Sequence, residues 1–103
     1  MYRTISTSGY SNITVIVKMR LATTTETGEY LQCVWYNGST WAVLKQINKS
    51  DPDADGQWHT YNLSAPSGAN NNPSFALKFS VYADNVNYDE DGWVDDLTVQ
   101  GTQ

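Results

Sequence analysis

The feature that most constrains the fold is the recurrence of apolar residues at every second position between Asn12 and Ala22, with Thr14, Ile16, Lys18 and Arg20 between them. Every second position carries a large apolar side chain: Ile13, Val15, Val17, Met19 and Leu21. Successive side chains of a β-strand point to opposite faces, so a period of two predicts a strand with one face in a core. No stretch shows a helical period of useful length. We therefore expect an all-β protein.

The same alternation returns along the rest of the chain. It predicts strands over residues 29–36, 40–47, 58–63, 75–81 and 92–100, and a short first strand over 2–7. Asn37-Gly38 stands between two of these strands and is the strongest short hairpin signal. Polar segments rich in Asp, Asn, Pro and Gly separate the others. Six to seven strands at this spacing predict a single antiparallel, jelly-roll-like β-sandwich over residues 1–103.

Charge and composition exclude several functions. Six basic and eleven acidic residues give a net charge of −5. Nucleic acid and anionic membrane surfaces are not expected as partners, because both attract clustered Lys and Arg. The apolar stretches are too short for a membrane span or a signal peptide. Cys33 is the only cysteine, so no internal disulfide forms, and it is expected as a buried thiol on the core face.

No catalytic constellation is present in the sequence. The single histidine, His59, has no neighbours that resemble a catalytic triad or a zinc motif. Nucleophile-elbow, metalloprotease and phosphate-cradling motifs are missing as well. We expect a protein that is not an enzyme.

The polar faces of three predicted strands supply a candidate binding surface. If these strands share a sheet, its outer face gathers Lys18, Arg20, Tyr30, Gln32, Tyr36 and Tyr82. Sugars bind such surfaces, because their C–H faces stack on aromatic rings and their hydroxyls pair with polar side chains. The alternative is that these residues are simply good strand formers, and the pattern alone favours it.

Six segments in order along the chain carry a resemblance to a known group of domains: 8–13, 27–31, 35–41 with its Trp35-Tyr36-Asn37-Gly38 start, Trp58 with 61–64, 75–79, and 91–99 with its Val94-Asp95-Asp96-Leu97 core. The chain resembles the MAM-like and carbohydrate-binding-module-like jelly-roll domains of secreted proteins over nearly its whole length, through short and degenerate motifs. The resemblance implies an extracellular, non-catalytic binding or accessory module, with a glycan as ligand. A protein-interaction or adhesion module and a calcium-stabilised structural spacer are the alternatives.

The resemblance also implies one or two further strands at the start of the domain, which carry calcium ligands in many members. Here the chain begins close to the segment before the Ile13 strand, so we expect these strands to be missing from it. A sheet edge would then be open, and a homodimer could form through that edge.

The closing segment supplies a candidate calcium site. Asp95 has the same strand parity as Leu97 and Val99, which predicts an inward carboxylate that needs a hydrogen-bond partner or a metal. Asp84 and Asp91 lie nearby in sequence, and hard oxygen ligands suit calcium. The resemblance implies the same role for Asp95. In the alternative, which the missing strands favour, Asp95 accepts backbone N–H bonds and the other acids solvate a turn.

A second candidate for calcium is the loop that contains Asp51, Asp53 and Asp55. These alternating carboxylates, followed by Gly56, match the first half of an EF-hand loop. The twelfth position is Asn62 where that motif needs Glu, and the flanks read as strands, so an EF-hand is excluded. The alternative, a solvated acidic loop with turn-forming Asp and Gly, is favoured.

Overall fold

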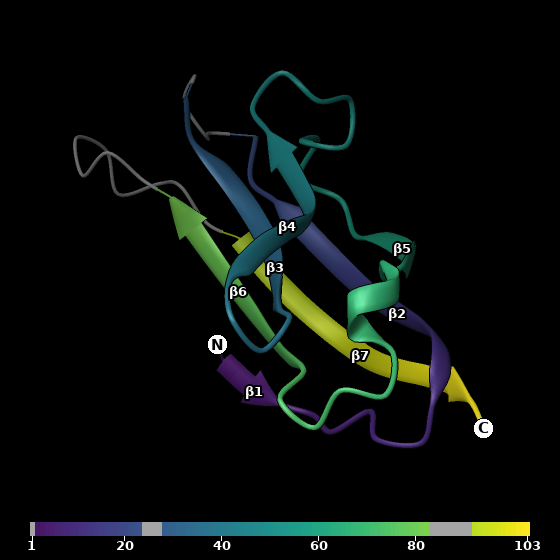
Figure 1. Ribbon diagram of the computed structural model, residues 1–103. Helices are drawn as coiled ribbons and strands as arrows, with labels where there is room; N and C mark the ends of the chain where they lie inside the picture. The colour runs from purple at the N-terminus through teal and green to yellow at the C-terminus, as the bar shows by residue number, and fades with distance from the viewer. Residues whose placement is uncertain (1, 24–27, 83–91) are drawn as a thin grey trace.

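The computed structural model describes residues 2–23, 28–82 and 92–103, and it shows an antiparallel β-sandwich (Figure 1). One sheet has the strand order β1-β6-β3-β4 and the other has the order β5-β2-β7. The strands are β1 (Tyr2–Thr4), β2 (Ser11–Leu21), β3 (Tyr30–Tyr36), β4 (Trp41–Asn48), β5 (His59–Ser64), β6 (Ala76–Tyr82) and β7 (Gly92–Thr102), and one 3-10 turn, η1, covers Ser67–Ala69. The predicted all-β sandwich is confirmed.

The core lies between the two sheets and is built on the alternation in β2. The five apolar side chains on its inner face (Ile13, Val15, Val17, Met19 and Leu21) are at most 2% exposed. They pack against buried side chains of the other sheet and its flanking loop, which are Leu31, Cys33, Trp35, Ile47, Phe75, Leu77 and Phe79. Removing a large apolar side chain from water stabilises the fold by about 1.5–3 kcal/mol. β2 is therefore the central strand of the protein.

Cys33 is part of this core, as the sequence predicts. Burial raises the pKa of its thiol to about 12. The reactive form of cysteine is the thiolate, so a thiol that stays protonated in an apolar site is unreactive. Cys33 therefore serves packing.

The order of the strands is that of a jelly roll with one edge position open. β2 pairs with both β5 and β7, and β3 pairs with both β4 and β6. An eight-stranded jelly roll has one more strand beside β7 than the described part of this chain provides. Figure 1 shows β2 and β7 running side by side along the molecule.

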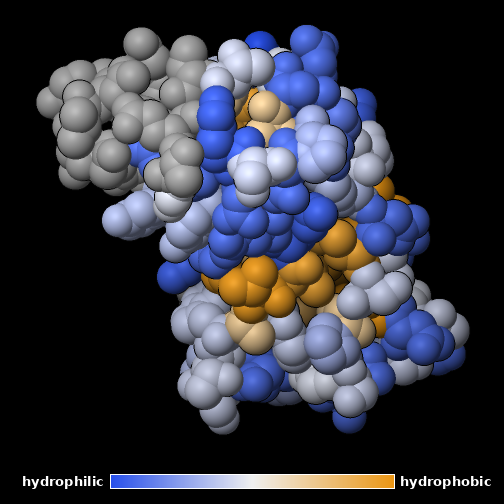
Figure 2. All heavy atoms as spheres, turned by 90° about the horizontal axis from the view of Figure 1, so that it is seen from above, coloured by the Kyte–Doolittle hydropathy of each residue, from blue (hydrophilic) through white to orange (hydrophobic). Residues whose placement is uncertain are grey.

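The hydrophobic core also reaches the surface. Figure 2 shows a band of hydrophobic residues between two more hydrophilic regions on the face seen from above. A domain of this size cannot cover all of its apolar surface, because its surface is large relative to its volume.

No helix among the described residues is long and apolar enough to cross a membrane.

Thr7 joins the segment between β1 and β2 to η1 and the loop after it through hydrogen bonds. Its hydroxyl donates to the carbonyl oxygen of Ala69 at 2.5 Å and accepts the backbone N–H of Asn72 at 2.9 Å. Its own N–H donates to the Asn72 carbonyl at 2.9 Å. Thr7 is 3% exposed, so water does not compete for these bonds.

We predict that Thr7→Val lowers the free energy of unfolding by about 2 kcal/mol, because the buried Ala69 carbonyl and the part-buried Asn72 N–H lose their side-chain partner. Urea denaturation followed by tryptophan fluorescence measures this. Thr7→Ser keeps the hydroxyl and should retain most of the stability. The exposed neighbour change Ser6→Ala should stay within about 0.5 kcal/mol of the parent. A Thr7→Val variant as stable as Ser6→Ala would contradict the prediction.

Candidate functional site

The outer face of the four-stranded sheet brings together four of the six predicted ligand-binding residues. Tyr30 pairs with Tyr82, and Gln32 and Tyr36 follow on the same side of β3. The intervening residues of β3 are buried in the core, so these side chains point outward. We call this surface the aromatic–amide face; it comprises Tyr30, Gln32, Tyr36, Trp41, Gln46, Asn48, Lys78 and Tyr82.

Two aromatic pairs stand at opposite ends of this face. The rings of Tyr30 and Tyr82 are stacked, with centroids 5.3 Å apart and planes at 16°. The rings of Tyr36 and Trp41 lie 5.1 Å apart and are tilted by 39°. Tyr30 and Tyr36 are six residues apart on one strand, which separates the pairs by roughly 20 Å at 3.3 Å per residue.

The two ends differ in how far they are open. The ammonium group of Lys78 lies 4.8 Å from the centre of the Trp41 ring, and Val34, which pairs with Lys78, is only 6% exposed although it faces outward. Trp41 at this end is 36% exposed. Tyr82, at the other end, is 52% exposed and presents its ring to solvent.

A row of amides lies between the aromatic pairs. Gln32 Nε2 donates to Gln46 Oε1 at 2.8 Å, and Gln46 Nε2 donates to Asn48 Oδ1 at 2.7 Å. Asp51 Oδ2 accepts the backbone N–H of Asn48 at 2.7 Å and faces its Nδ2 at 3.5 Å. An ionised carboxylate only accepts, so it holds the Asn48 amide with its NH₂ group toward Asp51. The row thus has a fixed direction, and it leaves Gln32 Oε1 as an acceptor on the face.

The four-stranded sheet is less acidic than the chain as a whole. The net charge of the protein is −5, yet none of the four strands of this sheet contains Asp or Glu. Lys78 adds a positive charge. The aromatic–amide face therefore does not repel a ligand that carries hydroxyl or carboxylate groups.

Lys18 and Arg20 do not belong to this face, because β2 lies in the other sheet. The prediction that they join the tyrosines is wrong. Arg20 Nε donates to the Gly56 carbonyl at 2.6 Å, and its guanidinium lies 4.5 Å from the centre of the Trp93 ring. Lys18 forms an ion pair with Asp96 at 3.1 Å. Both side chains serve contacts within the three-stranded sheet and its neighbouring loop.

Asp95 points to solvent, so its predicted inward orientation is wrong. Thr98 pairs with Ile16, whereas Asp95 pairs with Lys18, so two residues of β7 stand opposite one residue of β2. This is a β-bulge, and Asp96 in it has a positive φ of 51°. The extra residue reverses the parity: Val94, Leu97 and Val99 pack against the core, and Asp95 is exposed. Its Oδ1 accepts the Asp96 N–H at 2.8 Å.

The calcium site at the closing segment stays a prediction. Asp84 and Asp91 lie outside the described residues. Among the residues that the structure does describe, no three His, Cys, Asp or Glu side chains come together in a way that could hold a metal ion. Glu29, which precedes β3 directly, is a buried acid that the sequence analysis did not single out; it is 1% exposed and has a partner within the protein.

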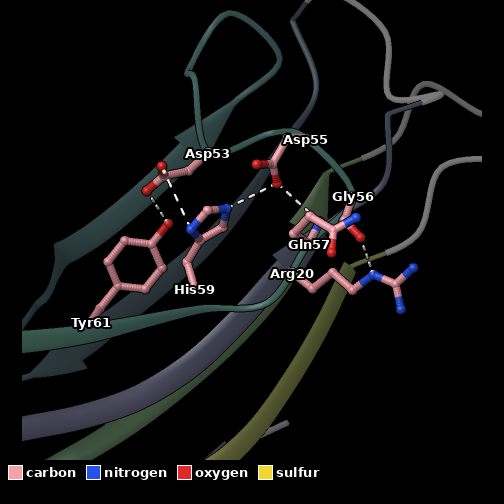
Figure 3. A network of polar contacts seen from close by, with 7 residues as sticks. All are labelled: Arg20, Asp53, Asp55, Gly56, Gln57, His59 and Tyr61. Atoms are coloured by element: carbon pink, nitrogen blue, oxygen red, sulfur yellow. Dashed lines mark hydrogen bonds and ion pairs between the residues drawn. The ribbon is translucent and has the colours of Figure 1, made fainter.

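Each carboxylate of the 51–55 loop is bound by protein groups, and Figure 3 shows those around Asp53 and Asp55. The Tyr61 hydroxyl donates to Asp53 Oδ2 at 2.6 Å, and burial, reinforced by this bond, raises the pKa of Tyr61. His59 lies between two acids, with Nδ1 3.8 Å from Asp53 Oδ1 and Nε2 2.9 Å from Asp55 Oδ1. Asp51 binds the Asn48 backbone as described above. A calcium ion at this loop stays a prediction.

The bulge in β7 can be tested with two substitutions at Asp96. Both Asp96→Gly and Asp96→Ala remove the exposed ion pair with Lys18, which contributes little. Only Ala retains a Cβ that opposes positive φ, so we expect the Gly variant to be more stable by about 1 kcal/mol. Urea denaturation of the two proteins measures the difference. Equal stability, or a more stable Ala variant, would contradict the bulge.

The His59–Asp55 contact predicts a specific dependence of stability on pH. The hydrogen bond from His59, followed by that from the Gln57 N–H, lowers the pKa of Asp55 below its ordinary value of 3.8. A lowered pKa contributes stability that is present above pH 3.8 and is lost as the pH falls through the folded-state value. Asp55→Asn and His59→Leu should both flatten the loss of stability below about pH 4. Unfolding curves at several acidic pH values measure this, and parallel slopes for parent and variants would contradict it.

No family model, curated protein or solved structure matches this chain. The resemblance to MAM-like and carbohydrate-binding-module-like domains therefore stays an expectation. The proposed function is therefore based on the residues of the aromatic–amide face.

Proposed function

We propose that this chain is a non-catalytic binding module that holds a glycan on its aromatic–amide face. The observation that carries the proposal is the pairing of two aromatic clusters with a row of amides on a sheet without Asp or Glu. Aromatic rings bind the apolar C–H faces of sugars, and amides bind hydroxyls, which are both donors and acceptors. This combination of groups suits a glycan.

The row of amides is already ordered before a ligand arrives. Gln32, Gln46 and Asn48 hold one another in place, so little side-chain freedom is lost on binding. Each NH₂ group has a second N–H in addition to the one used in the row, and Gln32 Oε1 can accept a sugar hydroxyl. The roughly 20 Å between the aromatic pairs favours an extended oligosaccharide over a single sugar.

The proposal that the chain is not an enzyme rests on the same surface. Hydrolysis of a glycosidic bond commonly uses two carboxyl groups on either side of that bond. The strands of the aromatic–amide face contain no carboxyl group, and the nearby Asp51 is engaged by Asn48. The resemblance to domains of secreted proteins adds an extracellular location to the proposal.

The proposal predicts that Tyr82→Ala and Tyr30→Ala each weaken glycan binding by about 2- to 10-fold, which corresponds to the 0.5–1.5 kcal/mol of an aromatic contact. A glycan array identifies the ligand, and titration calorimetry measures the affinity. Trp93→Ala is the matched control, because Trp93 is an exposed aromatic residue of the other sheet. It should bind like the parent.

Two outcomes would contradict the glycan proposal. One is a folded protein that binds nothing on the array. The other is binding that Tyr30→Ala and Tyr82→Ala leave unchanged, or that Trp93→Ala weakens to the same extent.

A further inference from the structure

β7 has an unpaired edge along its whole length among the described residues. It is an eleven-residue strand that pairs with β2 on one side, and no described strand pairs with its other side. This is the open edge position of the jelly roll. The backbone N–H and C=O groups of such an edge are a template for another strand.

The side of the sandwich next to this edge is also incompletely closed. A groove of about 510 Å³ lies between the segment after β1 and the end of β7, and Ile5, Tyr10, Ile13 and Val99 contribute apolar surface to it. A second groove, of about 270 Å³, lies between β6 and β7, and Leu31, Phe79, Val81 and Val94 contribute apolar surface to it. Val81 is 40% exposed although it alternates with the core residues of β6. Apolar surface therefore continues from the core to the free edge.

The other sheet edges are less suited to strand addition. β1 has three residues. β4 has a register shift opposite Cys33 and Val34, and its Lys45 turns toward the Tyr61 ring at 4.8 Å. Bulges, inward charges and short strands are the features by which proteins protect sheet edges. β5 has six residues, and His59 at its start is engaged with the acidic loop.

The two halves of β7 also differ in how well they are protected against strand addition. The first half contains the bulge and the exposed carboxylates of Asp95 and Asp96. The second half, Leu97 to Thr102, contains no charge and no proline, and the register shift in this region lies in β2 between Ser11 and Thr14. The unprotected part of the edge is therefore the segment Leu97–Thr102.

We propose that two copies of this chain associate by antiparallel pairing of Leu97–Gly101, with the two-fold axis at Val99. In this register Thr98 of each copy lies opposite the partner's Gln100, and the two three-stranded sheets become one sheet of six strands. The apolar grooves beside Val99 meet at the axis. The pairing is independent of the glycan proposal, since it uses the other sheet.

Charge disfavours registers whose two-fold axis lies closer to Asp96. With the axis at Val99, the Asp95–Asp96 pairs of the two copies are about seven residues apart along the strands, or roughly 23 Å. That is more than twice the Debye length of about 8 Å at physiological salt, so the pairs do not repel each other strongly. An axis near Asp96 would place four carboxylates side by side and is disfavoured.

Sedimentation velocity over a micromolar to millimolar concentration range tests the pairing. The parent should pass from monomer to dimer. Thr98→Glu should weaken the dimer at least tenfold, because residues 98 of the two copies are diagonal neighbours across the axis and like charges there repel. Thr98→Lys should behave in the same way, and an equimolar mixture of the two variants should restore a dimer. Thr98 is exposed, so circular dichroism should show that both variants stay folded.

The matched control is Thr60→Glu, which places the same charge on β5, the opposite edge of the same sheet. It should associate like the parent. A parent that is monomeric at every concentration overturns the proposal. So does a dimer that Thr98→Glu does not weaken, a mixture of charged variants that does not reassociate, or a dimer that Thr60→Glu weakens equally.

Discussion

Burial of one face of β2 is the interaction on which the rest of the structure depends. β2 is the middle strand of its sheet, and the five apolar side chains on its inner face meet the inner faces of β3 and β6. This contact decides which residues of the opposite sheet point inward. Because Leu31, Cys33 and Trp35 must face β2, Tyr30, Gln32 and Tyr36 must face outward. The aromatic–amide face is therefore a consequence of how the core is formed.

The sequence predicted those parts of the molecule that depend on local alternation. The strands and the outward direction of Tyr30, Gln32, Tyr36 and Tyr82 follow from a period of two, which each strand carries within itself. The sharing of a sheet depends on partners far away in the chain. For that reason the prediction that the tyrosines of β3 and β6 share a face is correct, and the prediction that the basic residues of β2 join them is wrong. Asp84 and Asp91 lie outside the described residues, so their calcium role is a prediction still.

Alternation fails as a guide where a strand contains an extra residue. One bulge at Asp96 turns Asp95 from the core to solvent, and nothing in the local pattern marks it, since Asp only tolerates positive φ better than most residues. The register shift in β4 likewise places Gln46 and Asn48 on the outer face, which an unbroken alternation from Trp41 does not predict. The loop acids show a different limit. Asp53 and Asp55 have the spacing of metal ligands, but their partners, His59 and Tyr61, come from the following strand.

The free edge and the aromatic–amide face lie on different sheets, and their geometry links the two proposals. Antiparallel pairing through β7 leaves the same face of both three-stranded sheets on one side of the joined sheet. Both four-stranded sheets pack on that side. A dimer of this kind would therefore carry both aromatic–amide faces on the same side. Two sites that face the same way can engage one polymer or one surface together, which raises the effective affinity without any new contact. For a single site built from a few aromatic rings and amides, such bivalent attachment would compensate for weak binding of each copy.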